Sequence, residues 1–221
     1  MTSTGHYLRS VTFTEKHRCF EAGDTFEFHP GVTLLVGDQG AGKSTLLTAL
    51  RAHVTRKEKL PTKLDLAVEG LTVLGRDFEK ENVRTQPGFG MSGISDFGFE
   101  VQAHFASHGE VVRMQLGTLD ELDGTKPTLL LFDEPDGSLS LRSIGEFRDQ
   151  LAALAAKGVQ VIASVHHPWV IEGFPEVLSM EHRRWMASDA FILTQKFPRP
   201  KAKAPKATPG TPRTRRKSKT T

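Results

Sequence analysis

The chain has 221 residues, of which 38% are hydrophobic and 25% are charged, an ordinary composition for one globular domain. It has no run of about 18 apolar residues, and its first residues lack the apolar core of a secretory signal, so we expect neither a membrane span nor export. A single cysteine, Cys19, argues against an internal disulfide framework and a multi-cysteine zinc site, and a cytoplasmic location is expected.

The net charge of +3 hides two parts of opposite sign. Residues 196–221 hold 10 of the 29 basic residues and no acid, which leaves 19 basic against 26 acidic residues in 1–195. The first part therefore carries −7 and the second +10. Five of the 12 prolines also lie in 196–221, without periodic apolar residues. We therefore expect a folded domain over 1–195 and a disordered Lys/Arg/Pro-rich tail over 196–221.

Apolar patterns along residues 1–195 alternate between strand and helix periods. In chain order they predict an antiparallel pair of strands at 7–14 and 25–28, a buried strand at 32–36, a helix at 44–56, strands at 64–68 and 71–74, a buried strand at 128–132, a helix at 141–157 that ends at Gly158, and a buried strand at 159–165. Strands that are apolar on both faces form parallel sheets covered by helices on both sides. The expected fold class is therefore α/β.

Residues 37–44 read GDQGAGKS and fit the phosphate-loop pattern G-x-x-x-x-G-K-[ST]. The glycines let successive backbone N–H groups point at phosphate oxygens, and the following helix adds its positive end. Lys43 supplies a charge for the β- and γ-phosphates, and the Ser44 hydroxyl is a Mg²⁺ ligand. A chance glycine-rich turn is the alternative, but an apolar strand precedes this loop and an apolar-faced helix follows it. The expected nucleotide-binding residues here are Gly37, Asp38, Gln39, Gly40, Ala41, Gly42, Lys43, Ser44 and Thr45.

A second acidic motif follows the buried strand at 128–132, where the sequence reads TLLLFDE. Asp133 and Glu134 leave the carboxyl end of that strand, where α/β sheets bind their ligands. Asp133 fits the carboxylate that holds Mg²⁺, and Glu134 fits a general base that polarises the attacking water. An exposed acidic pair is the alternative, and the neighbouring phosphate loop argues against it.

Three stretches, LLLFDEP, DGSLS and VIASVHHP, resemble the ATP-binding cassette (ABC) ATPases. The resemblance covers most of residues 5–182. It is similar to the soluble branch related to chromosome-maintenance and recombination-repair ATPases, in particular to compact bacterial and phage ATPases with an SHGE signature. It implies a P-loop NTPase with a mixed sheet flanked by helices, binding ATP and Mg²⁺.

The resemblance also assigns further residues to the site. Gln86 stands where the family has a glutamine that senses the γ-phosphate and Mg²⁺; a polar turn residue is the alternative. His166 matches the switch histidine that hydrogen-bonds the γ-phosphate. Tyr7, Arg18 and Phe20 lie where the family contacts the base, although each also suits strand packing or the surface. The expected catalytic residues are Lys43, Glu134 and His166, and the expected metal ligands are Ser44, Asp133 and Gln86.

Two motifs point to a second copy of the chain. Residues 107–110 read SHGE, and the resemblance implies that Ser107 and Gly109 cap the γ-phosphate bound by the other subunit. The alternative is an N-capping serine on the helix that follows. Residues 136–140 match the loop that crosses the dimer interface. The family thus implies an ATP-dependent homodimer.

The expected function is Mg²⁺-dependent ATP hydrolysis by a soluble ABC-type ATPase. Only 20 residues separate Gln86 from Ser107, which leaves room for a shortened signature subdomain and for neither a coiled-coil arm nor a transporter's helical subdomain. No membrane partner is therefore favoured. The tail suits non-specific contacts with nucleic acid, or is a solubilising extension. The alternatives for the whole chain are a transporter's nucleotide-binding subunit and a non-hydrolysing regulatory module.

Overall fold

The computed structural model describes residues 5–54, 60–78 and 108–196. Its centre is a six-stranded sheet in the order β5-β6-β7-β3-β8-β9. These strands are β3 (Val32–Val36), β5 (Thr72–Asp77), β6 (Thr128–Asp133), β7 (Gln160–Ser164), β8 (Glu176–Ser179) and β9 (Arg184–Ala187). Neighbours pair in parallel except β9, which pairs antiparallel to β8, so the sheet is mixed.

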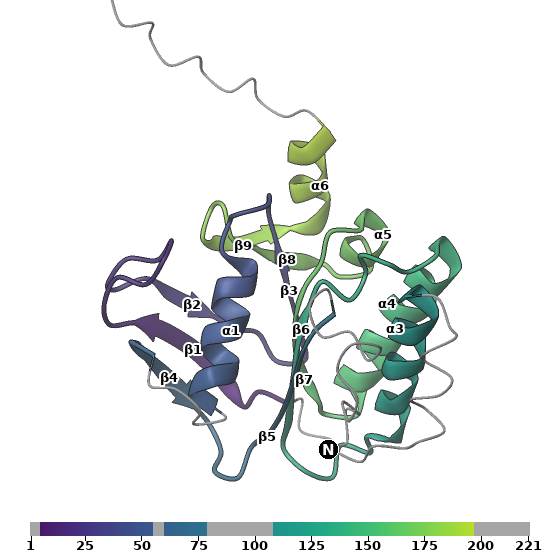
Figure 1. Ribbon diagram of the computed structural model, residues 1–221, viewed down its shortest axis with the longest axis horizontal. Coiled ribbons are helices and arrows are strands. Elements are labelled where there is room, and N and C mark those ends of the chain that lie inside the picture. Colours follow the sequence, from purple (N-terminus) through teal and green to yellow (C-terminus); the bar gives the residue numbers. More distant parts are fainter. Residues whose placement is uncertain (1–4, 55–59, 79–107, 197–221) are drawn as a thin grey trace, which may run out of the picture.

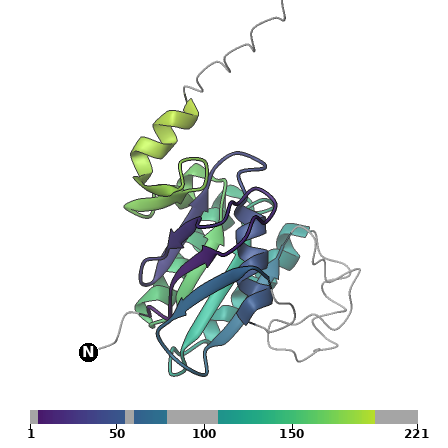
Figure 2. The same cartoon turned by 90° about the vertical axis from the view of Figure 1, so that its left-hand side faces the viewer.

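A second, three-stranded antiparallel sheet has the order β2-β1-β4. It consists of β1 (Leu8–Phe13), β2 (Thr25–Glu27) and β4 (Thr62–Leu66). Val11 in the middle strand lies opposite Phe26 on one side and Leu64 on the other. Figure 2 turns this sheet and the adjacent helix α1 (Lys43–Val54) toward the viewer.

The six-stranded sheet is covered on both faces (Figure 1). Helix α1 and the three-stranded sheet lie on one face, and α3 (His108–Gly117) and α4 (Leu141–Ala156) lie on the other. Successive residues of β3 show why: Leu34 packs into the core cluster on the α4 side, and Leu35 into the cluster on the α1 side. The remaining helices are the 3₁₀ turn η1 (Thr118–Glu121), α5 (Pro168–Ile171) and α6 (Ser188–Lys196). Within the described ranges, the structure contains no helix long and apolar enough to cross a bilayer.

The expected α/β class and most of the predicted elements are confirmed. The antiparallel pair, the three buried strands and both long helices lie within one or two residues of their predicted positions. Gly158 follows α4 with φ of +87°, the left-handed conformation of a glycine that ends a helix. The strands predicted at 64–68 and 71–74 also form, but β4 joins the small sheet and β5 the large one. The helix that follows Ser107 begins at His108, so residues 108–110 of the signature motif form its first turn.

The parallel strands all point the same way, so the loops that follow β3, β6 and β7 meet at one edge of the sheet. This edge is at the top of Figure 1, where the dark blue segment joins β3 to α1. The phosphate loop, the acidic motif and the switch histidine all follow these strands. The fold therefore brings them together.

Candidate nucleotide-binding site

The phosphate loop is a tight glycine turn between β3 and α1. Gly37, Gly40 and Gly42 have φ values of +141°, +83° and +99°, a region that other residues rarely adopt. At Gly42 space is also limiting. A Cβ there would lie 2.8 Å from Sγ of Cys19 and 2.7 Å from Cζ of Phe20. The glycine is thus required both by its conformation and by its packing.

Lys43 begins α1, and its side chain folds back over the loop. Its ammonium donates to the carbonyl oxygens of Gly37 at 2.7 Å and Asp38 at 3.1 Å. The residue is only 4% exposed, and this burial lowers the pKa of Lys43 below its ordinary value. The ammonium is thus held inside the loop at low hydration, where it would form a charge-assisted hydrogen bond with a bound phosphate.

Asp133 ends β6 and is joined to the phosphate loop through Ser44. The Ser44 hydroxyl donates to Oδ1 of Asp133 at 3.1 Å. Burial of Asp133 raises the pKa of its carboxyl, while hydrogen bonds from Ser164 and Ser44 oppose that rise. A serine hydroxyl and a carboxylate are hard oxygen donors, the kind that Mg²⁺ binds, so the pair fits that ion.

Ser164 is part of this site, although the sequence analysis does not identify it. It is fully buried at the end of β7, its hydroxyl donates to Oδ1 of Asp133 at 2.6 Å, and its oxygen accepts the backbone N–H of Glu134 at 2.9 Å. The parallel register pairs Asp133 with Ser164 directly. A serine at the carboxyl end of a predicted strand beside the acidic motif was the signal that could have revealed it.

Glu134 and His166 face each other across the ends of β6 and β7. Nε2 of His166 and Oε1 of Glu134 are 3.0 Å apart, and the two side chains are 38% and 31% exposed. Glu134 has φ of +53°, a strained conformation for a residue other than glycine, and such strain is concentrated at functional sites. The two residues that sequence reasoning assigns to catalysis are therefore in hydrogen-bond contact, and both reach solvent.

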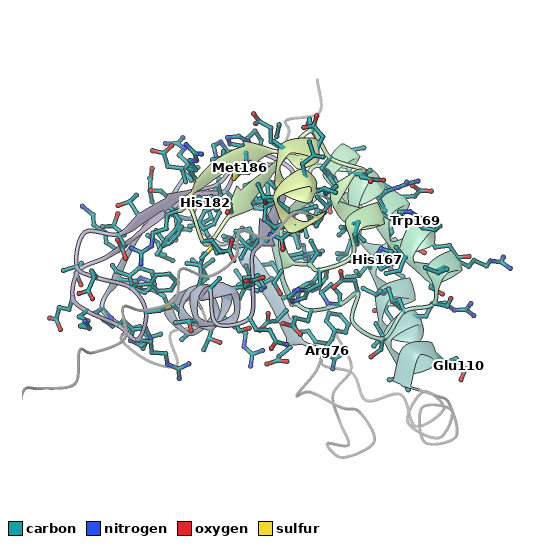
Figure 3. The ribbon with its side chains drawn as sticks, turned by 90° about the horizontal axis from the view of Figure 1, so that it is seen from above. Arg76, Glu110, His167, Trp169, His182 and Met186 are labelled. Atoms are coloured by element: carbon teal, nitrogen blue, oxygen red, sulfur yellow. The ribbon has the colours of Figure 1, made fainter. Side chains whose placement is uncertain are left out.

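Asp136, the first residue of the loop expected to cross a dimer interface, is buried within its own chain. It is 5% exposed, and its Oδ2 accepts the backbone N–H groups of His166 and His167, each at 2.7 Å. Figure 3, which looks down on the edge of the sheet, shows His167 between the central strands and the helices of the α4 side. The loop after β6 is thus bonded to the loop after β7.

The signature motif is described in part. Gln86 and Ser107 lie outside the described residues. Gly109 lies in the first turn of α3, where a Cβ would overlap the carbonyl oxygen of Ser138 in the same chain. The glycine therefore has a packing reason within its own chain, namely the close approach of α3 to the loop after β6.

Two of the three candidate base contacts are used for packing. The Tyr7 hydroxyl donates to the carbonyl oxygen of Gly158 at 2.8 Å, and Phe20 is 1% exposed in the core beneath the phosphate loop. Arg18 is exposed at the tip of the turn that His17 and Phe20 close through two backbone hydrogen bonds of 2.9 Å. Of these three, Arg18 is the one whose side chain is free to reach a base.

A contact from the C-terminal strands also reaches the phosphate loop. Oε1 of Glu181, in the turn between β8 and β9, accepts the backbone N–H of Asp38 at 3.1 Å. Arg183, in the same turn, bonds to Asp24 and donates to the carbonyl oxygen of Cys19 at 3.0 Å. The turn therefore bridges the phosphate loop and the 17–20 turn, a link between residues far apart in sequence that the sequence analysis does not predict.

Comparison with known proteins agrees with this geometry. Residues 15–113 match the AAA domain family. No curated protein sequence is significantly similar to the chain. A metal-chelate-type ABC transporter in an inward-facing conformation is similar in structure, with a TM-score of 0.55, 19% identity and coverage of 86% of this chain and 87% of that one.

Two further structures are similar. MJ1267, an ATP-binding cassette of an ABC transporter in its ADP conformation, has a TM-score of 0.56 at 16% identity and covers 87% of this chain and 95% of its own. UvrA2 from Deinococcus radiodurans has a TM-score of 0.53 at 16% identity, over 80% of this chain and 36% of that one. The fold is therefore that of the ABC-type P-loop ATPases. The residues that match the AAA domain family include the phosphate loop at 37–44.

Proposed function

We propose that this protein binds ATP with Mg²⁺ and hydrolyses it in the cytoplasm. The observation that carries the proposal is the contact between Glu134 and His166 at 3.0 Å, beside the phosphate loop. A buried lysine, an oxygen pair for a divalent cation, a carboxylate base and a histidine are the parts that phosphoryl transfer from a nucleotide to water requires.

The position of each site residue indicates its role in binding or hydrolysis. Lys43 offers its ammonium to the phosphates, and the glycine turn presents backbone N–H groups to them. Ser44 and Asp133 would hold Mg²⁺, which supplies neutralisation of phosphate charge when bound. Glu134 accepts the proton of the attacking water. His166 orients the Glu134 carboxylate and reaches the same side of the site.

The test is phosphate release from ATP by the whole chain. The protein should release phosphate with Mg²⁺ and stop when the metal is chelated. Lys43→Ala should abolish release and weaken nucleotide binding, because the polyphosphate loses a charge-assisted contact. Lys63→Ala is the matched control, an exposed lysine on β4 away from the loop, and should behave as the wild type. Turnover by Lys43→Ala at the wild-type rate would contradict the proposal. Absence of phosphate release by the wild type would support the non-hydrolysing alternative.

We further propose that ATP joins two copies of the chain. Support comes from the SHGE motif. In the family that the chain resembles, the residues that correspond to Ser107 and Gly109 cap the γ-phosphate bound by the other copy. Light scattering should show a dimer of Glu134→Gln at saturating ATP and a monomer without it. Ser107→Arg should block dimerisation and leave nucleotide binding by the monomer intact. A Glu134→Gln monomer at saturating ATP would overturn this step.

The physiological partner is proposed from charge. The tail at 196–221 carries +10, which suits non-specific contact with the phosphates of nucleic acid, and the domain at 1–195 carries −7. The rival function is the nucleotide-binding subunit of a transporter, which two of the similar structures favour. Co-purification of a membrane protein with the ATP-trapped Glu134→Gln variant would support that rival, and recovery of nucleic acid would support our proposal.

A further inference from the structure

The strongest unexplained feature of the site is the carboxylate of Asp136. Both of its bonds go to backbone N–H groups of consecutive residues, His166 and His167, and both use the same oxygen, Oδ2, at 2.7 Å. The other oxygen, Oδ1, is buried and has no hydrogen-bond partner among the described residues. Burying a carboxylate with one unpaired oxygen costs free energy, and the two hydrogen bonds to Oδ2 offset part of that cost.

Those two bonds fix the backbone from which the catalytic histidine projects. His166 follows β7 by two residues, where the regular ladder of the sheet has ended. His167 is the N-cap of α5, and its Nδ1 accepts the N–H of Trp169 at 3.2 Å. Asp136 therefore anchors the short segment between the last strand residue and the first helix turn. The His166 ring lies in that segment.

The same carboxylate also fixes the spacing between the two catalytic side chains. Asp136 lies two residues after Glu134, and the Glu134 N–H is bonded to Ser164 of the neighbouring strand. The backbone of Glu134 is thus fixed by Ser164, and the backbone of His166 is fixed by Asp136. These two contacts together set the distance of 3.0 Å between the Glu134 and His166 side chains. A loss of alignment of about 1 Å can lower a rate by about 100-fold.

We propose that Asp136 is a positioning residue that holds the His166 imidazole on the Glu134 carboxylate. The proposal rests on the proposed hydrolysis of ATP at this site. Asp136 touches neither substrate nor metal in this account. It acts only through the backbone of His166 and His167, which gives it a distinct experimental signature.

The first experiment compares two variants by steady-state ATP hydrolysis. Asp136→Ala removes both bonds and should lower kcat by about 10- to 100-fold while KM for ATP changes by less than about 3-fold. Asp136→Asn keeps an oxygen that accepts the same two N–H groups without the charge, so it should lose less than about 5-fold. Asp149→Ala on α4 is the matched control, an exposed aspartate paired with Arg148, and should be unchanged.

A double-mutant cycle separates positioning from general loss of structure. If Asp136 acts through His166, adding Asp136→Ala to His166→Ala should cause no further loss of kcat. A further loss equal to that of the single variant would overturn the proposal. So would a kcat for Asp136→Ala equal to the wild type, or a loss in Asp136→Asn as large as in Asp136→Ala. If Asp136→Ala does not fold, the cycle is run with Asp136→Asn, whose smaller loss should likewise vanish in the His166→Ala background.

A second measurement does not depend on turnover and so distinguishes failure of this proposal from failure of the proposed function. In NMR spectra, the Cε1–H resonance of His166 is assigned by its loss in His166→Ala. Its chemical shift should change in Asp136→Ala and should stay within one wild-type linewidth in Asp149→Ala. Absence of hydrolysis by the wild type would refute the function, and this resonance would still test the contact. An unmoved His166 resonance in folded Asp136→Ala would refute the positioning role.

Discussion

Replacing Ser164 by alanine removes two hydrogen bonds inside the site without touching a predicted ligand of phosphate. The hydroxyl donates to the Asp133 carboxylate at 2.6 Å and accepts from the Glu134 N–H at 2.9 Å. A bond to a charged group contributes about 1.5–3 kcal/mol, and a neutral one about 0.5–1.5 kcal/mol. Because Ser164 is fully buried, water cannot replace the lost partner, and Ser164→Ala should lower the free energy of unfolding by about 2–4 kcal/mol at neutral pH.

The effect should depend on pH, because Ser164 acts on an ionised group. Burial already raises the pKa of Asp133 above 3.8, and the Ser164 hydrogen bond lowers it. A raised pKa in the folded state means that the folded protein binds the proton more tightly than the unfolded chain, so stability from this group falls as pH rises through the folded pKa. Ser164→Ala removes that hydrogen bond and raises the folded-state pKa of Asp133 further. The decrease in the free energy of unfolding caused by the substitution should therefore be smallest near pH 3.8 and reach its full size above the raised pKa.

Urea unfolding of the metal-free protein across this pH range measures the effect. Ser179→Ala is the matched control, a fully buried serine in β8 whose oxygen accepts one longer bond, from the His182 N–H at 3.3 Å. That control should lose less than about 1.5 kcal/mol, with no change between the two ends of the range. Equal losses in Ser164→Ala and Ser179→Ala, or a Ser164→Ala loss that does not vary with pH, would refute the account of Asp133.

Two further predictions follow from the packing and the charge. Gly109→Ala should destabilise the protein by about 1–3 kcal/mol, because its methyl group would overlap the Ser138 carbonyl. Gly117→Ala in the same helix places its methyl group in open space and should stabilise the protein by a few tenths to about 1 kcal/mol. Thermal unfolding of both variants measures the contrast. A chain ending at Gln195 should keep basal ATP hydrolysis and lose most of its affinity for DNA or RNA. Binding of nucleic acid by the full chain should weaken steeply as the salt concentration rises. Unchanged affinity after truncation would show that the tail is not the binding element.

Local patterns account for the parts of the fold that the sequence predicts. The strands at β3, β6 and β7 are continuous apolar runs between clear turns, and α1 and α4 have one apolar face each, so period and length identify them. The strands β8 and β9 have four residues each and no such pattern, and their formation depends on pairing with β3 and with each other. Pairing also decides that β4 and β5 join different sheets, because the chain between them gives no sign of which partner each strand has.

The same division applies to the site. Lys43, Asp133, Glu134 and His166 belong to motifs with fixed spacing, and the structure brings all four to one edge of the sheet. Ser164 and Asp136 act through hydrogen bonds between adjacent strand ends, which depend on the register of β6 against β7. That register forms only when β6 and β7, which are separated in the chain by α4, pair in the folded sheet.

The most direct test of the central claim, that Glu134 is the base of an ATP-hydrolysing site, is phosphate release by Glu134→Gln under conditions where ATP is bound. The amide keeps the size and the reach to His166 but does not accept the proton of water. We expect bound ATP and Mg²⁺ with hydrolysis at least about 100-fold slower than the wild type. Hydrolysis at the wild-type rate by a Glu134→Gln protein saturated with ATP would contradict the account.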